Sequence, residues 1–114
     1  MKRIEAIVRP SKLEAVHEVL RARGIDRFAV SIAEGTGAEP PLTQLSSRTD
    51  RTVSFTPKVR LEVLLADELA TSIVRDIVEA ARTGRVGDGR IFVMAVEDVI
   101  VIRTGTHVSE LSST

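Results

Sequence analysis

Apolar and polar residues alternate along several short stretches of the chain and follow helical spacing along two longer ones. Residues 2–8 alternate as a half-buried strand does, and every second residue is Val or Leu across 59–65. Residues 13–20 and 69–81 instead place aliphatic side chains three or four positions apart, which predicts two amphipathic helices. Further apolar runs predict strands at 28–33, 91–96 and 98–103.

Local signals predict where these elements begin and end. Ser11, followed by Glu14 three residues later, is typical of a capping box at the start of the first helix. Gly24 is then expected to end that helix, and Asp67 is expected to cap the second one. The polar segment from Gly105 onward is expected to be a loose tail.

The predicted order is strand, helix, strand, strand, helix, strand, with one short strand more near the end. This order is the α+β, ferredoxin-like split βαβ arrangement (βαββαβ), in which both helices cover one face of the sheet. The sheet is predicted to be aliphatic, so its other face needs cover, which favours self-association. Residues 36–52, between the second and third strands, are polar and lack any period. A loop of that length inside a small domain usually has a function.

Composition narrows the class of protein. A chain of 114 residues suits a single domain, and one this short benefits from oligomerisation. The 16 basic and 16 acidic side chains cancel, so no general attraction to nucleic acid or anionic membranes is expected. The absence of cysteine excludes disulfides and thiolate metal sites. No apolar run reaches membrane-spanning length and the N-terminus is unlike a secretion signal, which predicts a cytoplasmic protein.

The stretch of the sequence that indicates chemistry most clearly is Thr83-Gly84-Arg85-Val86-Gly87-Asp88-Gly89-Arg90-Ile91-Phe92. Glycines allow tight turns and close approach of the backbone to a ligand. Exposed N–H groups beside guanidinium groups form a phosphate cradle. The stretch therefore predicts a phosphate-holding loop between a helix and a strand. The alternative is an ordinary turn with Gly84 as the helix C-cap.

The same stretch also resembles the C-terminal signature of the P-II signal-transduction proteins. Gly35-Thr36-Gly37, residues 53–62, residues 99–105 and the first ten residues are similar to P-II segments in the right order. The resemblance implies a domain at 1–105, a target-binding loop at about 36–55 and a flexible tail at 106–114. It further implies a homotrimer with nucleotide sites between subunits, where ATP and ADP compete and 2-oxoglutarate often joins Mg-ATP.

The resemblance also implies roles for individual residues. Gly87, Asp88, Gly89 and Arg90 match the phosphate-contacting motif, and Arg103 matches a phosphate-binding arginine. Lys58 matches the lysine placed near the 2-oxoglutarate carboxylate. Gly35 and Gly37 match glycines at the base of the long loop, and Leu64 falls where backbone groups read adenine.

Several positions depart from the P-II pattern. Arg51 stands where the family has its uridylylated tyrosine, and the chain has no tyrosine, so tyrosine uridylylation is impossible. A loop serine is the remaining alternative for modification. Ala38 and Val101 replace arginines that would face a triphosphate, and Ala29 replaces a threonine that contacts adenine.

Glu39 stands where the family has a glutamine. Two like charges about 4 Å apart repel by roughly 4 kcal/mol at an intermediate dielectric, so Glu39 opposes a bound dicarboxylate. The same carboxylate is a candidate Mg²⁺ ligand, and Lys58 belongs to the same candidate effector site. We therefore expect that ATP, ADP or AMP binds, whereas 2-oxoglutarate is not sensed in the usual way.

The predicted function is a non-enzymatic P-II-like regulator of a partner enzyme or transporter in nitrogen metabolism. No catalytic residue and no nucleic-acid partner are predicted, and any membrane contact is through a transporter partner. One alternative is a divergent P-II-like regulator that responds to another input, such as bicarbonate in carbon metabolism.

Two other classes of protein use the same scaffold. A small phosphohydrolase would need its phosphate loop after the first strand, where Arg9-Pro10-Ser11 contains no glycine. An RNA-binding sheet needs exposed aromatics, and the chain offers only three phenylalanines, at positions 28, 55 and 92. His17 and His107 are isolated and predict no metal cluster.

Overall fold

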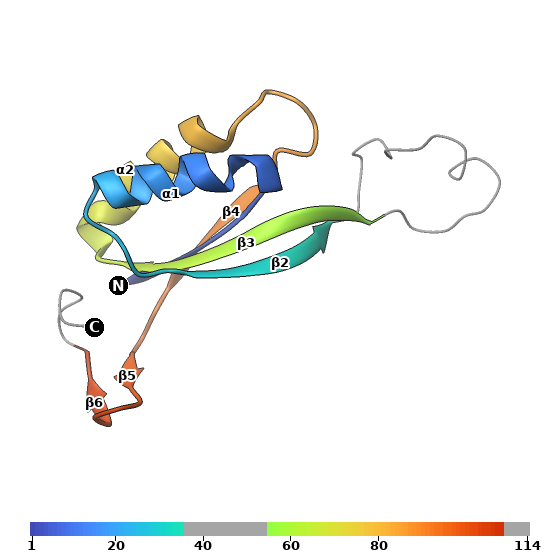
Figure 1. The fold of residues 1–114 in the computed structure, drawn as a ribbon. Helices are drawn as coiled ribbons and strands as arrows, with labels where there is room; N and C mark the ends of the chain where they lie inside the picture. Colours follow the sequence, from blue (N-terminus) through green and yellow to red (C-terminus); the bar gives the residue numbers. More distant parts are fainter. Residues whose placement is uncertain (36–54, 109–114) are drawn as a thin grey trace.

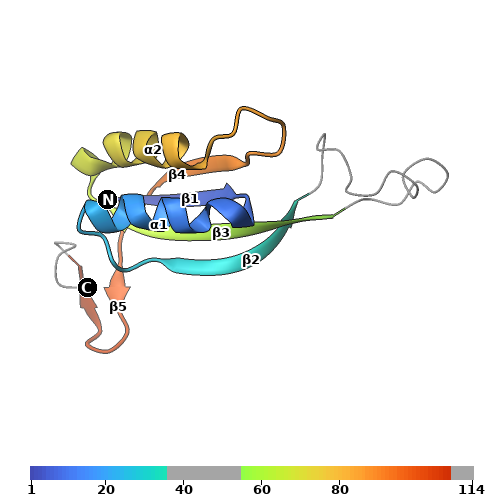
Figure 2. The ribbon, with the colours of Figure 1, turned by 45° about the horizontal axis from the view of Figure 1, so that its top comes forward.

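The computed structural model describes residues 1–35 and 55–108. Four antiparallel strands in this part of the chain form one sheet in the order β2-β3-β1-β4. The strands are β1 (Lys2–Val8), β2 (Ala29–Gly35), β3 (Thr56–Leu65) and β4 (Arg90–Ala95). Helices α1 (Leu13–Ala22) and α2 (Asp67–Ala81) lie side by side on one face of the sheet (Figures 1 and 2). The predicted ferredoxin-like split βαβ fold is confirmed.

The first helix begins differently from the prediction. A short 3-10 helix, η1 (Pro10–Lys12), precedes α1 and contains Ser11, and neither helix start has a side-chain cap. The predicted capping box is therefore wrong, because proline sets the first turn without it. Gly24 does end the helix: its φ is 78°, and its N–H donates to the carbonyl of Arg21 at 3.0 Å. The N–H of Ile25 donates to Leu20 at 2.9 Å, which completes a Schellman motif.

The second helix begins where the sequence predicts, but Asp67 is its first residue and not its cap. Ala66 occupies the N-cap position and supplies no side-chain hydrogen bond. The Asp67 carboxylate instead lies 2.8 Å from the amino group of Met1. An acidic residue in the first turn still suits the positive end of the helix dipole.

The core lies between the helices and the face of the sheet that they cover. Alternate residues of β1 and β3 point into it, and Ile4, Leu61, Ile73 and Ile77 are fully buried. Burying a side chain of this size contributes about 1.5–3 kcal/mol, so this aliphatic layer holds the two helices against the sheet.

The opposite face of the central strands carries charges. Arg3 lies 3.5 Å from Glu5 and 3.1 Å from Glu62, and Arg60 lies 2.9 Å from Glu5. The expectation of an aliphatic sheet is therefore wrong for this face of β1 and β3. Cross-strand pairs of opposite charge stabilise the pairing of these strands in place of apolar contacts.

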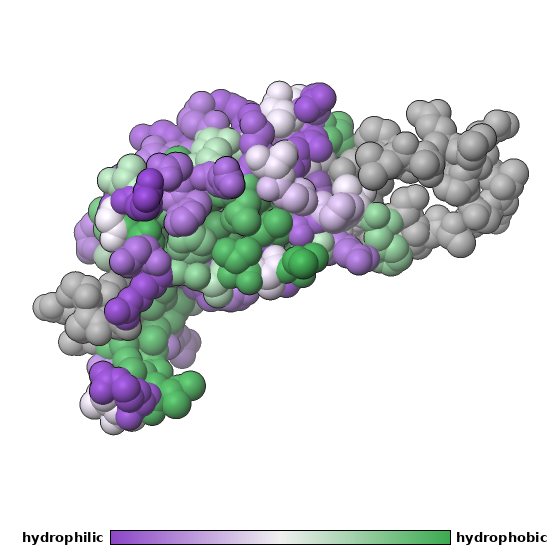
Figure 3. All heavy atoms as spheres, in the orientation of Figure 1, coloured by the Kyte–Doolittle hydropathy of each residue, from purple (hydrophilic) through white to green (hydrophobic). Residues whose placement is uncertain are grey.

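Exposed apolar side chains lie on the edge strand β2 and on the C-terminal hairpin (Figure 3), and Phe92 and Val93 are exposed on the other edge strand, β4. Val30 and Ile32 of β2 are 47% and 85% exposed. Ile100 and Ile102 of the hairpin are 52% and 98% exposed. Large apolar side chains left in water at an edge strand are typical of a surface that a partner covers.

The hairpin corrects two expectations about the end of the chain. The predicted strand at 98–103 is reduced to β5 (Ile100–Val101), which pairs with β6 (Thr106–His107) outside the main sheet. The tail expected to be loose from Gly105 is therefore paired at 106–107, and Val108 is buried. Residues 109–114 lie outside the described residues, as does 36–54 of the predicted recognition loop. None of the described helices is long and apolar enough to cross a membrane.

Candidate functional site

The glycine-rich loop connects α2 to β4 and is folded around the carboxylate of Asp88. One carboxylate oxygen, Oδ2, accepts hydrogen bonds from the backbone N–H groups of Thr83 and Gly84, both at 2.8 Å. The other, Oδ1, accepts the Thr83 hydroxyl at 2.5 Å and Nε of Arg9 at 3.0 Å. These bonds, led by that of the Thr83 hydroxyl, hold the pKa of the Asp88 carboxyl well below its usual range. The ionised side chain therefore braces the loop.

Gly84 is not the helix C-cap. Helix α2 ends at Ala81 with Arg82 at the C-cap position, and Gly84 follows two residues later with φ 87°. Its N–H serves the Asp88 carboxylate, so this glycine belongs to the loop. The alternative of an ordinary helix-ending turn is thus wrong in its assignment of Gly84.

Gly89 brings the loop back against the first strand. Its φ is 101°, and a Cβ at this position would stand 1.7 Å from the carbonyl oxygen of Ile7. Only glycine fits so close to a neighbouring backbone. Arg90 then starts β4 directly opposite Ile7 in the register of β1 and β4.

Lys58 and Gly35 form the opposite wall of the site. Lys58 is only 5% exposed, and its ammonium donates a hydrogen bond to the carbonyl of Gly87. Gly35 lies against the aliphatic part of this lysine: a Cβ there would stand 3.3 Å from Cγ of Lys58. The lysine thus connects the start of β3 to the glycine-rich loop.

Between these walls lies a cavity of ≈ 490 Å³. Among the described residues, its cationic lining residues are Lys58, Arg85 and Arg90, and its acidic lining residue is Asp88. Because the charge of Asp88 is matched by Arg9, the cations dominate the electrostatics. Ile7, Val86 and Phe92 add apolar surface to the same cavity. A pocket with this lining can hold an anion together with a flat or apolar group.

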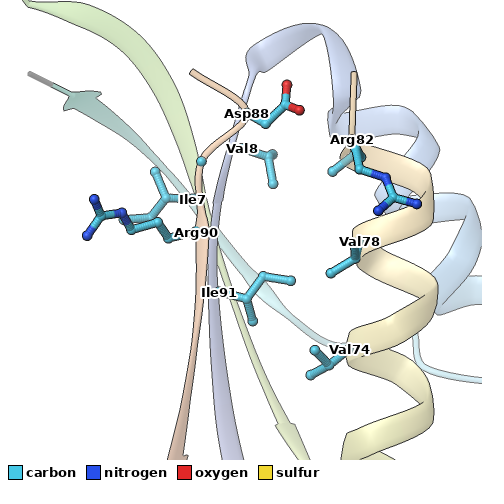
Figure 4. A pocket seen from close by; sticks show the side chains of 10 residues that line it. Ile7, Val8, Val74, Val78, Arg82, Asp88, Arg90 and Ile91 are labelled. Carbon is cyan, nitrogen blue, oxygen red and sulfur yellow. The ribbon is translucent and has the colours of Figure 1, made fainter. Parts of the chain in front are cut away.

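A second cavity, of ≈ 400 Å³, lies on the helix side of the sheet. Val74 and Val78 of α2 and Ile91 of β4 face one another across it (Figure 4). Ile7 of β1 and Arg90 of β4 also line this cavity, and in Figure 4 their side chains point away from α2. Arg90 thus borders both cavities, whereas Lys58 and Arg85 line the first and not the second.

The structure brings together six of the residues singled out from the sequence: Gly35, Lys58, Gly87, Asp88, Gly89 and Arg90. Arg103 lies instead in the turn of the β5–β6 hairpin, and Leu64 lies near the far end of β3. Gly37 and Glu39 lie outside the described residues, as does Ala38.

Sequence reasoning gave no role to several residues that belong to the site. Ile7 and Phe92 line the cavity from β1 and β4, and Val86 lines it from the loop. Arg85, one of the two guanidinium groups expected in the phosphate cradle, lines the cavity too. Arg9 binds the loop from 79 residues away in sequence, and no local pattern signals such a contact.

The remaining candidates do not form a site among the described residues. His17 packs its ring edge-on against Phe28, with centroids 5.2 Å apart. His107 pairs with Asp98 at 2.7 Å. No group of three or more potential metal ligands occurs in residues 1–35 and 55–108.

Of the phenylalanines, Phe28 packs partly buried against the core and Phe55 precedes β3, which leaves Phe92 as the one within a strand. The three thus do not form the exposed aromatic platform of an RNA-binding sheet.

Comparison with known proteins identifies the family. The family model "Nitrogen regulatory protein P-II" matches residues 1–106. The chain belongs to the P-II family. It is 49% identical over 105 residues to the nitrogen regulatory protein P-II of Rhizobium meliloti (strain 1021), and 46% identical to that of Azospirillum brasilense. Each match covers 92% of this chain and 94% of the relative.

A solved structure supports the same assignment. Arabidopsis thaliana PII bound to citrate superposes with a TM-score of 0.74 at 35% sequence identity. The match covers 95% of this chain and 88% of the plant chain. P-II proteins are signal-transduction regulators, so the resemblance seen in the glycine-rich stretch is confirmed at the level of the family.

Proposed function

We propose that this P-II protein senses adenine nucleotides in the cavity between the glycine-rich loop and Lys58, and regulates a partner protein in nitrogen metabolism without catalysing a reaction. The observation that carries the proposal is the meeting of Lys58, Arg85 and Arg90 around one cavity in a P-II chain. Phosphates suit guanidinium and ammonium groups, and adenine suits the apolar surface of Ile7, Val86 and Phe92.

Each cation is expected to contribute separately to phosphate binding. Charged hydrogen bonds contribute about 1.5–3 kcal/mol each, so Arg90→Ala should weaken ADP binding by roughly ten- to a hundredfold. Arg21→Ala is the matched control, since Arg21 lies on α1 in an exposed pair with Glu18. Calorimetric titration with ATP, ADP and AMP measures both variants. Equal affinities for the two would show that the phosphate binds elsewhere.

The complete site is proposed to form between the subunits of a homotrimer. Arg103, matched by resemblance to a phosphate-binding arginine, lies on a hairpin that extends away from the sheet of its own chain (Figure 1). The apolar side chains of β2 and of the hairpin are exposed in the single chain, and a neighbouring subunit would cover them. Light scattering of the purified protein tests the trimer, and a monomer at micromolar concentration would contradict it.

The partner is proposed to bind the segment at about 36–55. This proposal rests on the length, polarity and lack of period of 36–52, since 36–54 lies outside the described residues. Deleting 38–52 should abolish partner binding and leave the trimer and its melting temperature nearly unchanged. Loss of the trimer on deletion would show that the segment has a structural role instead.

The effector is proposed to differ from 2-oxoglutarate. Ala38 and Val101 withdraw two cations from the phosphate end of the site, and Glu39 adds a carboxylate. ADP and AMP should then compete well with ATP, with Glu39 a candidate ligand for Mg²⁺. Bicarbonate is the smaller anion that Lys58 could hold, so a titration with bicarbonate belongs beside that with 2-oxoglutarate. The setting proposed for this activity is the cytoplasm.

A further inference from the structure

The glycine-rich loop is fastened to the first strand through one side chain. The guanidinium of Arg9 donates from Nε to the Asp88 carboxylate at 3.0 Å and from one terminal nitrogen to the carbonyl of Val86 at 2.8 Å. Arg9 directly follows β1, so its backbone is held by the central strand of the sheet. The two bonds fix two points of the loop relative to that strand.

We propose that Arg9 is a positioning residue of the anion site, which sets the direction of the glycine-rich loop and neutralises Asp88 inside it. The proposal rests on the proposed function for its ligand, but the state of the loop can be measured without any ligand. Arg9 is not among the residues that line the cavity. It therefore acts through Asp88 and Val86, without touching what the cavity binds.

The hydrogen bonds of Arg9 and of Thr83 to Asp88 hold the loop in different ways. The bonds from Thr83 and Gly84 to Asp88 join residues four and five positions apart, so they close the loop upon itself. The bonds from Arg9 join the loop to β1 and bridge 77 and 79 positions. Without Arg9 the turn would stay closed, and Gly89 and Lys58 would still hold its last residues, but Val86 and Asp88 would lose their bonds to the residue that follows β1.

Arg9 also offsets the negative charge of Asp88. Asp88 places a negative charge in the lining of a cavity meant for an anion. The side chains of Arg9 and Asp88 are only 22% and 23% exposed, so water screens the pair less than it screens a surface ion pair. With Arg9 beside it, Asp88 repels an incoming phosphate less. The fork of a guanidinium can serve the carboxylate and the carbonyl together, whereas a lysine offers a single point charge.

The test compares Arg9→Gln and Arg9→Lys with the control Arg21→Gln, whose arginine forms an exposed pair on α1. Circular dichroism first establishes that each variant is folded. NMR then follows the backbone amides of Val86, Gly87 and Asp88, and the Asp88 carboxyl carbon through an acid titration, without nucleotide. In Arg9→Gln we expect shifted, more mobile amides at 86–88 and a raised pKa of Asp88, with the amides of Thr83 and Gly84 nearly unchanged.

Calorimetry with ADP provides the second readout. Arg9→Gln should weaken ADP about tenfold, Arg9→Lys should recover part of that loss, and Arg21→Gln should bind as the natural protein does. In the double variant Arg9→Gln/Asp88→Asn, the loss of ADP affinity should be smaller than the sum of the losses in the two single variants, since both substitutions remove the same contact.

Two outcomes separate this proposal from the proposed function. If the amides at 86–88 and the Asp88 titration are the same in Arg9→Gln as in the natural protein, the positioning role is overturned whatever happens to ADP. If they change as expected but the natural protein binds no adenine nucleotide, Arg9 still positions the loop, and the proposed ligand is wrong. If Arg9→Gln fails to fold, the amide signals of residues 86–88 in the milder variant Arg9→Lys test the positioning role instead.

Discussion

The Cα atom of Gly89 lies so close to the backbone of Ile7 that a Cβ at position 89 would stand 1.7 Å from the Ile7 carbonyl oxygen. The contact joins the end of the glycine-rich loop to the central strand β1. Since Arg90 follows directly and pairs with Ile7, the same contact also sets where the guanidinium of Arg90 enters the cavity.

Gly89→Ala should therefore destabilise the protein more than the same change at Gly84. Both glycines have positive φ, at 101° and 87°, which costs an alanine about 1–2 kcal/mol. A Cβ at Gly84 would meet nothing within 4 Å, whereas that at Gly89 would collide with backbone. Urea unfolding of the two variants measures the difference. Equal losses of unfolding free energy would mean that β1 yields to the added methyl group.

Asp88 should make stability depend on pH in acid. Its pKa is lowered in the folded protein, so its hydrogen bonds stabilise the fold fully above the unfolded pKa of about 4. This contribution is lost progressively as the pH falls below that value. The unfolding free energy of the natural protein should thus fall more steeply from pH 5 to pH 3 than that of Asp88→Asn. Glu79→Gln, which removes an exposed carboxylate, is the control.

Lys58 provides a test of the other wall of the cavity. Lys58→Met keeps an unbranched side chain against Gly35 but removes the ammonium that binds the Gly87 carbonyl. ADP should bind at least about tenfold more weakly, because a charged donor is lost from the cavity. Lys2→Met, at the far end of β1, removes the same charge outside the cavity and should leave the affinity unchanged. Equal effects would point to net charge and not to the site.

The fold could be predicted from the sequence because the spacing of apolar residues differs clearly between the strands and the helices. Gly24 marked the end of the first helix, and its positive φ is the conformation that this helix end requires. The prediction of a capping box failed at Ser11, because Pro10 starts a 3-10 turn that needs no side-chain cap. Sequence reasoning also missed the hairpin β5–β6, in which Gly105, with φ 68°, donates to the carbonyl of Val101. Short strands that pair only with each other leave too little period to recognise.

The candidate site was predictable where the chemistry is local. The loop glycines and Arg90 stand together in sequence, and the resemblance added Gly35 and Lys58. Arg9 was out of reach, because its bond to Asp88 spans 79 positions and follows only from the pairing of β1 with β4.

Glu39 decides the prediction about the effector. The residue lies outside the described part of the chain, so the argument is one of charge: its carboxylate opposes a dicarboxylate near Lys58. The natural protein should bind 2-oxoglutarate weakly in the presence of Mg-ATP, and Glu39→Gln should gain affinity. Calorimetry of both proteins, with bicarbonate titrated in parallel, measures this. Tight binding of 2-oxoglutarate by the natural protein would overturn the expectation.

A mixing experiment tests whether one site draws on two subunits. Arg90 lines the cavity of its own chain, whereas Arg103 lies on the hairpin that leaves that chain's sheet. Arg90→Ala and Arg103→Ala should each weaken ADP at every site of a homotrimer made of one variant. Two differently tagged variants, produced together, give mixed trimers that can be isolated through both tags.

If neighbouring subunits supply Arg90 and Arg103 to one site, each mixed trimer isolated through both tags keeps both arginines at about one of every three sites, because a ring of both variants has one junction of the right order. Calorimetry should then show a minor class of sites with the natural affinity. If both arginines came from one chain, every site in the mixture would lack one of them, and no such class would appear. The stoichiometry of tight binding thus distinguishes a site within one chain from a site between two, and only the second gives the hairpin a direct part in sensing the nucleotide.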